Sequence, residues 1–269
     1  MSYKVTERHK SYLTQLKSYH LFTCSSINWD KQIAEPYQQG EIGPNEKFWA
    51  DIKNKYNSSK IERLVCLDKL KVRYWESKQK KARRMDSDLY SNWKRRYPFV
   101  KKVLQGDQES WREAVRKYAT FHKELDVAQA YSLHVYDQKT VECDVFLQPI
   151  DVIIPFKIEK ITKRGYLRYH DMPKTKRYSL YESYVYSCLL KIVQDLFAVL
   201  PCNTIYLNGI AGTRTHHSPI ISTVVEDTLD RRLQNPILVL QKHRHMVSFK
   251  KRSGFQPIER VYSPTLMIQ

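Results

Sequence analysis

The sequence predicts an α+β fold, in which a basic N-terminal helical region packs with an antiparallel sheet that is covered by one long helix. Two observations lead to this fold class. The spacing of apolar residues changes from three and four to two near residue 127, which separates helices from strands. The second part then runs as strands, one helix and strands again, an order typical of an α+β layer. We therefore expect a helical region over 1–126 and an α+β domain over 127–269.

The first region contains two well-marked helical patterns. The segment "IERLVCLDKLKVRYW" (61–75) carries apolar residues three and four positions apart, which predicts an amphipathic helix. In "GDQESWREAVRKYATFHKEL" (106–125), Gly106 can end one helix and Asp107 can cap the next. Pro98 is expected to open a further turn.

The second region alternates as strands do. We predict a hairpin in "YSLHVYDQKTVECDVFLQ" (131–148) and a second pair of strands that turns at 163–165. The segment 179–201 returns to a helical pattern that Pro201 ends, and "NTIYLNGIAG" (203–212) and "SPIISTVVED" (218–227) follow as β-branched strands.

The cysteine content and the polarity of the chain indicate the cellular compartment in which the protein works. The five cysteines contain no C-x-x-C pair, so we expect neither a disulfide framework nor a zinc knuckle, and a reducing compartment. The first twenty residues are polar, and the longest apolar stretch, "VYSCLLKIVQDLFAVL" (185–200), contains Lys191 and Asp195. Neither segment resembles a signal peptide or a membrane span. We expect a cytoplasmic protein without a membrane partner.

Positive charge is concentrated in one run. The chain carries a net charge of +18, and residues 71–102, with twelve Lys/Arg against three acids, contribute +9 of it. Dense local cations bind nucleic-acid phosphates by releasing condensed counterions. The sequence therefore predicts phosphate-backbone binding through eight residues of this run: Lys78, Lys80, Lys81, Arg83, Arg84, Lys94, Arg95 and Arg96.

Two other interpretations of the run stay open. It can be the solvated face of a helix, or a docking surface for an acidic protein. Aromatic side chains alternate with the cations and can either stack on unpaired bases or pack in the core, and for these we favour the core: Tyr74, Trp75, Tyr90, Trp93, Tyr97 and Phe99.

Carboxylates suggest one catalytic alternative. Glu142 and Asp144 share one face of a predicted strand, and Asp151 follows closely. Such a group can hold Mg²⁺ in a metal-dependent nuclease. However, the E-x-K motif of that class is not matched, because Glu159 and Lys160 are adjacent and point to opposite faces. We therefore predict no cofactor, and Mg²⁺ only if the chain is a nuclease. The sequence also lacks the G-x-S-x-G, P-loop and G-x-G-x-x-G motifs.

Five segments resemble the C-terminal portion of a family of bacterial proteins that carry a domain of unknown function. They run in order between about residues 95 and 260: "KKVLQGDQESWREAV", "ECDVFLQPIDVIIPF", "LYESYVYSCLLKIVQDLFAVLP", "PIISTVVEDTLDRRLQN" and "HRHMVSFKKRSGFQPIERV". The resemblance implies a bacterial cytoplasmic setting and no assigned catalytic residues. Longer members of the family carry an additional N-terminal segment.

Three functions follow as expectations. The first is a non-catalytic nucleic-acid-binding protein. The second is a metal-dependent nuclease that uses the acidic strand. The third is a protein-interaction module of a bacterial defence system.

Overall fold

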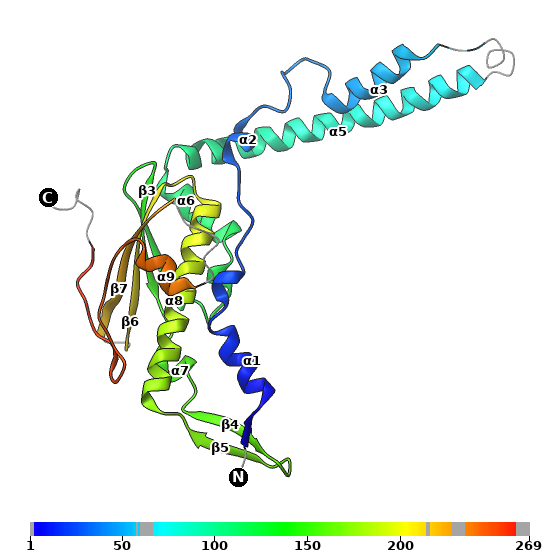
Figure 1. The fold of residues 1–269 in the computed structure, drawn as a ribbon. Helices are drawn as coiled ribbons and strands as arrows, with labels where there is room; N and C mark the ends of the chain where they lie inside the picture. Colours follow the sequence, from blue (N-terminus) through cyan, green and yellow to red (C-terminus); the bar gives the residue numbers. More distant parts are fainter. Residues whose placement is uncertain (1–2, 58, 60–66, 214–215, 228–234, 262–269) are drawn as a thin grey trace. The chain divides into compact units, whose positions relative to one another are not determined.

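The computed structural model describes the chain except residues 1–2, 58, 60–66, 214–215, 228–234 and 262–269. The chain forms two compact units (Figure 1). Unit 1 combines residues 1–27 with 105–269, and unit 2 is Asn28–Leu104. This division differs from the predicted boundary at residue 126, because the segment before residue 28 and the helix after Gly106 belong to the same unit as the sheet.

A five-stranded sheet in the order β2-β3-β6-β7-β8 is the centre of unit 1. Three of its four pairings are antiparallel, as predicted, whereas β3 and β6 are parallel. The parallel pairing arises because α8 lies between these two strands in the sequence, and a helical crossover returns the chain in the same direction. The strands are β2 Ala130–Val135, β3 Thr140–Phe146, β6 Thr204–Thr213, β7 His216–Glu226 and β8 Arg244–Val247.

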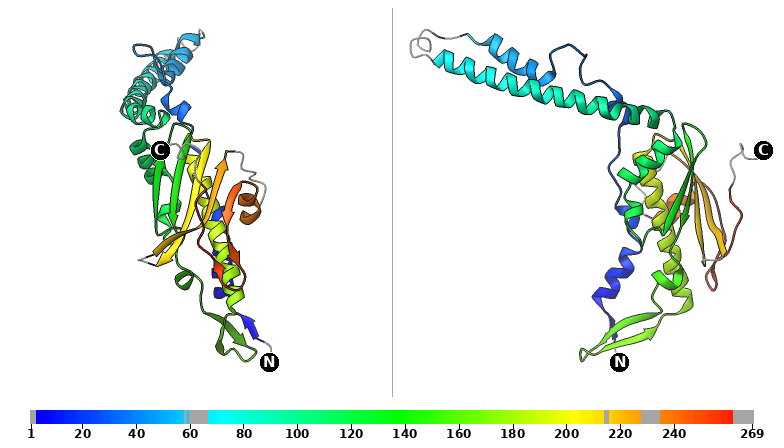
Figure 2. Two further views of the ribbon diagram at one scale, coloured as in Figure 1. Left: turned by 90° about the vertical axis from the view of Figure 1, so that its left-hand side faces the viewer. Right: turned by 180° about the vertical axis from the view of Figure 1, so that it is seen from behind.

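Helix α8, Lys174–Val199, lies along one face of this sheet (Figure 2). Val141, Cys143 and Val145 on β3 are fully buried, and so is most of α8. The alternating residues Glu142 and Asp144 consequently lie on the opposite face. The predicted hairpin, long helix and following strands are therefore confirmed.

Shorter elements surround this layer. Asp107 caps α6, Gln108–Tyr118, by accepting the N–H of Ser110 at 2.9 Å, as predicted. A three-stranded sheet has the order β1-β4-β5. The remaining elements of unit 1 are β1 Tyr3–Val5, α1 Glu7–Gln15, η1 Tyr19–Leu21, η2 Phe121–Lys123, α7 Ile150–Ile153, β4 Lys157–Thr162, β5 Leu167–Asp171, α9 Pro236–Gln241, β9 Phe249–Lys250 and β10 Gly254–Phe255.

Two buried charges of α8 hold distant segments of unit 1 together. The Asp195 carboxylate accepts backbone N–H groups from Cys24, Thr120 and Phe121, each at 2.9 Å. The Lys191 ammonium donates to the Thr120 hydroxyl at 3.0 Å and to the Phe22 carbonyl. Both side chains are essentially inaccessible to solvent. The hydrogen bonds compensate for their burial and fix the segments around residues 22–24 and 120–121 against the helix.

Unit 2 is an elongated helical hairpin. It consists of α2 Trp29–Ile33, α3 Pro44–Lys55 and α5 Leu67–Leu104, with α3 and α2 packed along α5. Part of the predicted helix 61–75 lies outside the described residues. At a rise of 1.5 Å per residue, the 38 residues of α5 extend about 57 Å.

Pro98 lies inside α5, so the prediction that it opens a new turn is wrong. Its ring removes one helical hydrogen bond, but Pro98 is exposed, and water can solvate the freed carbonyl. Val100 and Val103, which follow it, are buried and hold the helix in place on its other side.

Within the described residues, no helix combines the length and the apolar character that crossing a membrane would require.

Candidate nucleic-acid interface

The net charge of unit 2 resides on α5. The sequence Leu67–Leu104 has thirteen Lys/Arg and four Asp/Glu, a net charge of +9, whereas residues 28–66 have six of each. Two of the four acids on α5 are engaged within the unit. Glu76 pairs with Lys53 at 2.8 Å, and Asp86 is buried beneath the start of α3. The helix therefore presents a strongly cationic surface.

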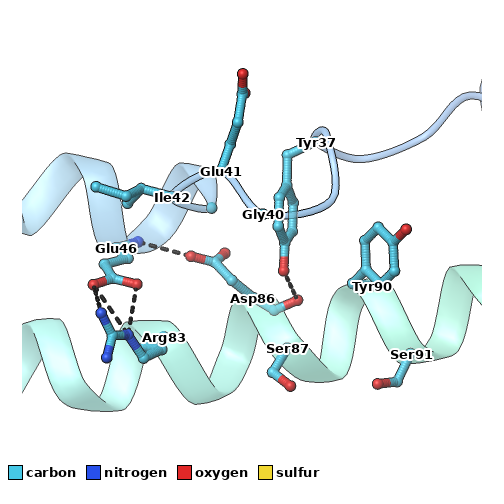
Figure 3. Close-up of a pocket in the computed structure, with 11 residues that line it drawn as sticks. Tyr37, Gly40, Glu41, Ile42, Glu46, Arg83, Asp86, Ser87, Tyr90 and Ser91 are labelled. Carbon is cyan, nitrogen blue, oxygen red and sulfur yellow. Dashed lines mark hydrogen bonds and ion pairs between the residues drawn. The ribbon is translucent and has the colours of Figure 1, made fainter.

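Asp86 fixes α3 onto α5. Its carboxylate accepts the backbone N–H of Glu46 at 2.8 Å (Figure 3). It also accepts the backbone N–H of Asn45 at 3.2 Å and the Asn45 side-chain amide at 2.7 Å. Gly43, the residue before α3, has no side-chain cap hydrogen bond. Asp86 thus supplies from another helix the acceptor that the first N–H groups of α3 require.

Gly43 is required at this position by space. A Cβ atom on Gly43 would lie 2.4 Å from the Asp86 carboxylate. Beside this contact, the loop 37–43 and α5 enclose a pocket of about 300 Å³, and the Tyr37 hydroxyl donates to the Asp86 carbonyl at 2.9 Å across it (Figure 3). The pocket therefore belongs to the contact by which the loop 37–43 packs on α5.

Arg83 has a structural partner. Its guanidinium contacts both carboxylate oxygens of Glu46, with Nε at 3.0 and 3.2 Å and Nη2 at 2.9 Å. Figure 3 shows the side chain directed at Glu46. These hydrogen bonds are the main cause of the lowered pKa of Glu46, and they raise the pKa of Arg83. Of the eight predicted phosphate ligands, Arg83 is the one that pairs with an acidic side chain among the described residues of unit 2.

The other predicted cations reach solvent. None of them lies within ion-pair distance of a carboxylate in the part of the chain that the structure describes. Six are exposed: Lys80, Lys81, Arg84, Lys94, Arg95 and Arg96. The seventh, Lys78, is half-buried, and its ammonium lies over the rings of Tyr74 at 5.2 Å and Trp49 at 5.9 Å.

Arg73, which was not among the predicted ligands, is also exposed. Arg73, Arg84 and Arg95 are eleven residues apart along α5. Since eleven residues make about three turns, the three arginines share one face of the helix. We call them the arginine line.

The aromatic residues of the basic run mostly pack within unit 2. Trp75 contacts Tyr56, Phe99 contacts Trp29, and the rings of Tyr37, Tyr90, Trp93 and Tyr97 follow one another at centroid distances of 5.4, 5.3 and 5.1 Å. Tyr74 is 54% exposed, with its ring against Trp49 and beneath Lys78. The expectation that these rings form core is therefore met only in part, because Trp75, Tyr90, Trp93, Tyr97 and Phe99 pack on other aromatic side chains but stay half-buried, and Tyr74 is exposed.

The acidic strand of unit 1 is already engaged by polar groups. Glu142 and Asp144 accept the two N–H groups of the Asn208 amide at 2.7 and 2.8 Å. Arg260 binds the same two carboxylates at 3.3 and 2.8 Å. The segment that carries Arg260 crosses the sheet on the side away from α8 (Figure 1), where the Val261 N–H donates to the Ser222 hydroxyl.

Asp151, the third carboxylate of the nuclease hypothesis, lies on α7 and pairs with Arg177 at 2.9 Å. Tyr136 donates to Glu142, and burial together with this hydrogen bond raises the pKa of Tyr136, which keeps it a donor. No group of three or more His, Cys, Asp or Glu among the described residues is arranged to hold a metal ion. The geometry of the strand supports a hydrogen-bonded network between side chains.

Sequence reasoning did not identify several of the residues that shape these two regions. Their partners are distant: Glu46 and Arg83 are 37 residues apart, and Asp144 and Arg260 are 116 apart. The sequence could have indicated a structural role only for Asp86. This acid lies on the same face of the predicted helix as its apolar residues, where an exposed charge is not expected.

Comparison of the chain with protein-family models, with curated proteins and with solved structures gives no match. The resemblance to a bacterial family therefore stays a prediction.

Proposed function

We propose that this chain is a non-catalytic nucleic-acid-binding protein of the bacterial cytoplasm that holds phosphate backbone on the exposed side of α5. One observation carries the proposal. All of the net charge of unit 2, +9, lies on α5, and six of the eight predicted cations are exposed without a carboxylate partner in the described part of the chain.

The physical basis is counterion release. Each phosphate that a lysine or arginine neutralises frees condensed cations, so affinity falls with salt at a slope of about −0.9 per contact on duplex DNA. Such contacts position the protein without reading sequence. We therefore expect strong salt dependence and little sequence preference.

The test is binding to labelled DNA and RNA across a salt series. The variant Lys80→Gln/Arg84→Gln/Arg95→Gln removes three exposed cations and leaves the Arg83–Glu46 pair intact. The matched control, Lys163→Gln/Arg164→Gln/Arg168→Gln, removes three exposed cations from the β4–β5 hairpin of unit 1. We expect the salt slope to fall by about 3 for the first variant and to stay unchanged for the control. Equal binding by all three proteins would exclude α5 as the interface.

A protein-interaction module is the second candidate, and one observation favours it. A flank of α5 exposes large apolar side chains beside Lys78 and Lys81: Leu67 at 46%, Tyr74 at 54%, Met85 at 53% and Leu89 at 40%. This flank fits an acidic amphipathic helix, since its cations would pair with the partner's acids around an apolar seam. Capture of one acidic protein at high salt, lost on Met85→Asp/Leu89→Asp while nucleic-acid binding persists, would support it.

The metal-dependent nuclease is the weakest of the three hypotheses, because Asn208 and Arg260 already occupy the carboxylates of Glu142 and Asp144. Lanes with Mg²⁺ and with EDTA in the same binding series test it. Cleavage that requires Mg²⁺ and disappears in Glu142→Ala/Asp144→Ala would establish it.

A further inference from the structure

The spacing of cations on α5 carries information about the form of the nucleic acid. Arg73, Arg84 and Arg95 are exposed and follow one another at eleven residues. At 1.5 Å per residue these steps are about 16.5 Å each and about 33 Å in total. Arg95 lies in the turn before Pro98, where the proline removes one hydrogen bond, but the helix is continuous from Leu67 to Leu104, so the three arginines remain on one helix.

A double helix offers phosphates at a matching interval. One turn of duplex DNA is about 34–36 Å long, and a line along its side crosses each of the two strands once per turn. Such a line therefore meets a sugar–phosphate backbone about every 17 Å on average. The two intervals within a turn are unequal, because the minor groove is narrower than the major groove. The arginine line matches their mean over one full turn, and the long arginine side chains can reach a backbone on either side of that mean position.

A single strand would make different demands. Proteins that bind it without sequence preference combine a basic groove with aromatic rings on which successive bases stack. On α5 the rings of Trp75, Tyr90, Trp93 and Tyr97 pack against other aromatic residues of unit 2. Only Tyr74 of the basic run has a largely exposed ring, and the Lys78 ammonium lies over it.

The segment between the two basic blocks supports the same conclusion. From Met85 to Trp93 the helix has no Lys or Arg, and it carries Asp86 and Asp88. A flexible single-stranded nucleic acid lying along α5 would find no cation to contact its phosphates in this segment. A rigid duplex bridges it, since its groove spans the interval between successive backbone crossings.

We infer that α5 binds the backbone of double-helical nucleic acid, lying along about one turn of the duplex with the arginine line at successive strand crossings. This inference rests on the proposed function and narrows its ligand from nucleic acid in general to the duplex form.

The first arm of the test measures binding of the full chain to a duplex of about 24 bp and to each of its separated strands, at matched salt. A second arm shortens the duplex. At 3.4 Å per base pair a contact of 33 Å needs about 10 bp. We expect clear preference for the duplex, and affinity that falls sharply once it is shorter than about 10 bp.

A third arm alters the spacing and leaves the composition unchanged. The variant Arg84→Ser/Ser91→Arg exchanges two exposed residues of α5, moves the central guanidinium about 10 Å toward Arg95 and preserves net charge. We expect several-fold weaker duplex binding with unchanged single-strand binding. The variant Arg84→Lys is the control that keeps charge and position, and it should bind the duplex nearly as the natural chain does.

The outcomes separate the inference from the proposed function. Equal affinity for duplex and single strand, or full duplex affinity in the exchange variant with intact helicity, overturns the inference and leaves phosphate binding by α5 standing. No binding to any nucleic acid at low salt overturns both.

Discussion

The carboxylate of Asp86, in the middle of α5, accepts the backbone N–H of Glu46 in the first turn of α3 at 2.8 Å. One residue thereby caps a helix that begins 42 positions earlier in the sequence, at Pro44. Three residues before Asp86, Arg83 binds the side chain of the same glutamate. Two successive contacts, one to the backbone and one to the side chain of Glu46, determine how the hairpin of unit 2 closes.

Removing this cap should destabilise unit 2. Asp86 is buried, and Asp86→Ala leaves the N–H groups of Asn45 and Glu46 without their acceptor. A lost cap with unsatisfied buried donors costs about 2 kcal/mol. Four of the five tryptophans lie in unit 2, so urea unfolding followed by tryptophan fluorescence reports the change. The control is Asp88→Ala, an exposed acid two positions away. Equal midpoints for both variants would show that the cap has no energetic role.

The Glu46–Arg83 pair should make unit 2 sensitive to acid. The pKa of Glu46 is lowered, chiefly by the Arg83 hydrogen bonds. The pair therefore stabilises the fold above the ordinary glutamate pKa of about 4.3, and its contribution is lost as pH falls through the lower folded value. Glu46→Gln should unfold at lower urea than the natural chain at neutral pH, and the difference should shrink below about pH 4.

An exposed acid of the loop that precedes α3, Glu41, provides the control for this measurement. Glu41→Gln changes a carboxylate that is exposed, so its effect on the unfolding midpoint should be small and should not vary between neutral and acid pH. A constant gap between the natural chain and Glu46→Gln over the whole pH range would contradict the pairing.

Local sequence patterns predicted the helices and strands of this fold. Contacts between residues far apart in the sequence determine how these elements pack together. The alternation of Val141, Cys143 and Val145 is enough to place β3, and Asp107 is enough to begin α6. The parallel pairing of β3 with β6 joins residues that are 64 positions apart, and no periodicity encodes such a partner. The spacing of apolar residues was therefore enough to predict the fold class, but it could not predict which strands pair or in which register.

The candidate interface on α5 shows the same limit for single residues. The density of cations in residues 71–102 identified the region, but it could not distinguish Arg83 from Arg84. Adjacent residues of a helix point about 100° apart, so one guanidinium turns to Glu46 and the other to solvent. The helix also continues through Pro98, because the buried side chains after it outweigh the one hydrogen bond that it lacks.

Asp144 and Arg260 should be energetically coupled. Their side chains are 2.8 Å apart and partly buried, and Arg260 also reaches Glu142. A double-mutant cycle with Asp144→Ala and Arg260→Ala should give a coupling free energy of about 1 kcal/mol, measured by urea unfolding with circular dichroism. EDTA should not shift either midpoint. A coupling near zero, or stabilisation of the natural chain by Mg²⁺, would favour the nuclease interpretation of this strand.

Asp195 should be the most sensitive of these positions to substitution. It is fully buried, accepts three backbone N–H groups and the Thr120 hydroxyl, and lies 3.8 Å from the Lys191 ammonium. Asp195→Ala leaves a buried cation and three donors poorly compensated, which costs about 3–5 kcal/mol. Gln194→Ala on the same helix is the control, since its Oε1 has no hydrogen-bond partner among the described residues. Because the affected contacts belong to unit 1, the proposed nucleic-acid binding by α5 should persist at temperatures where Asp195→Ala is still folded. A decrease of less than about 1 kcal/mol in the free energy of unfolding would contradict this prediction and show that water can replace the Asp195 carboxylate.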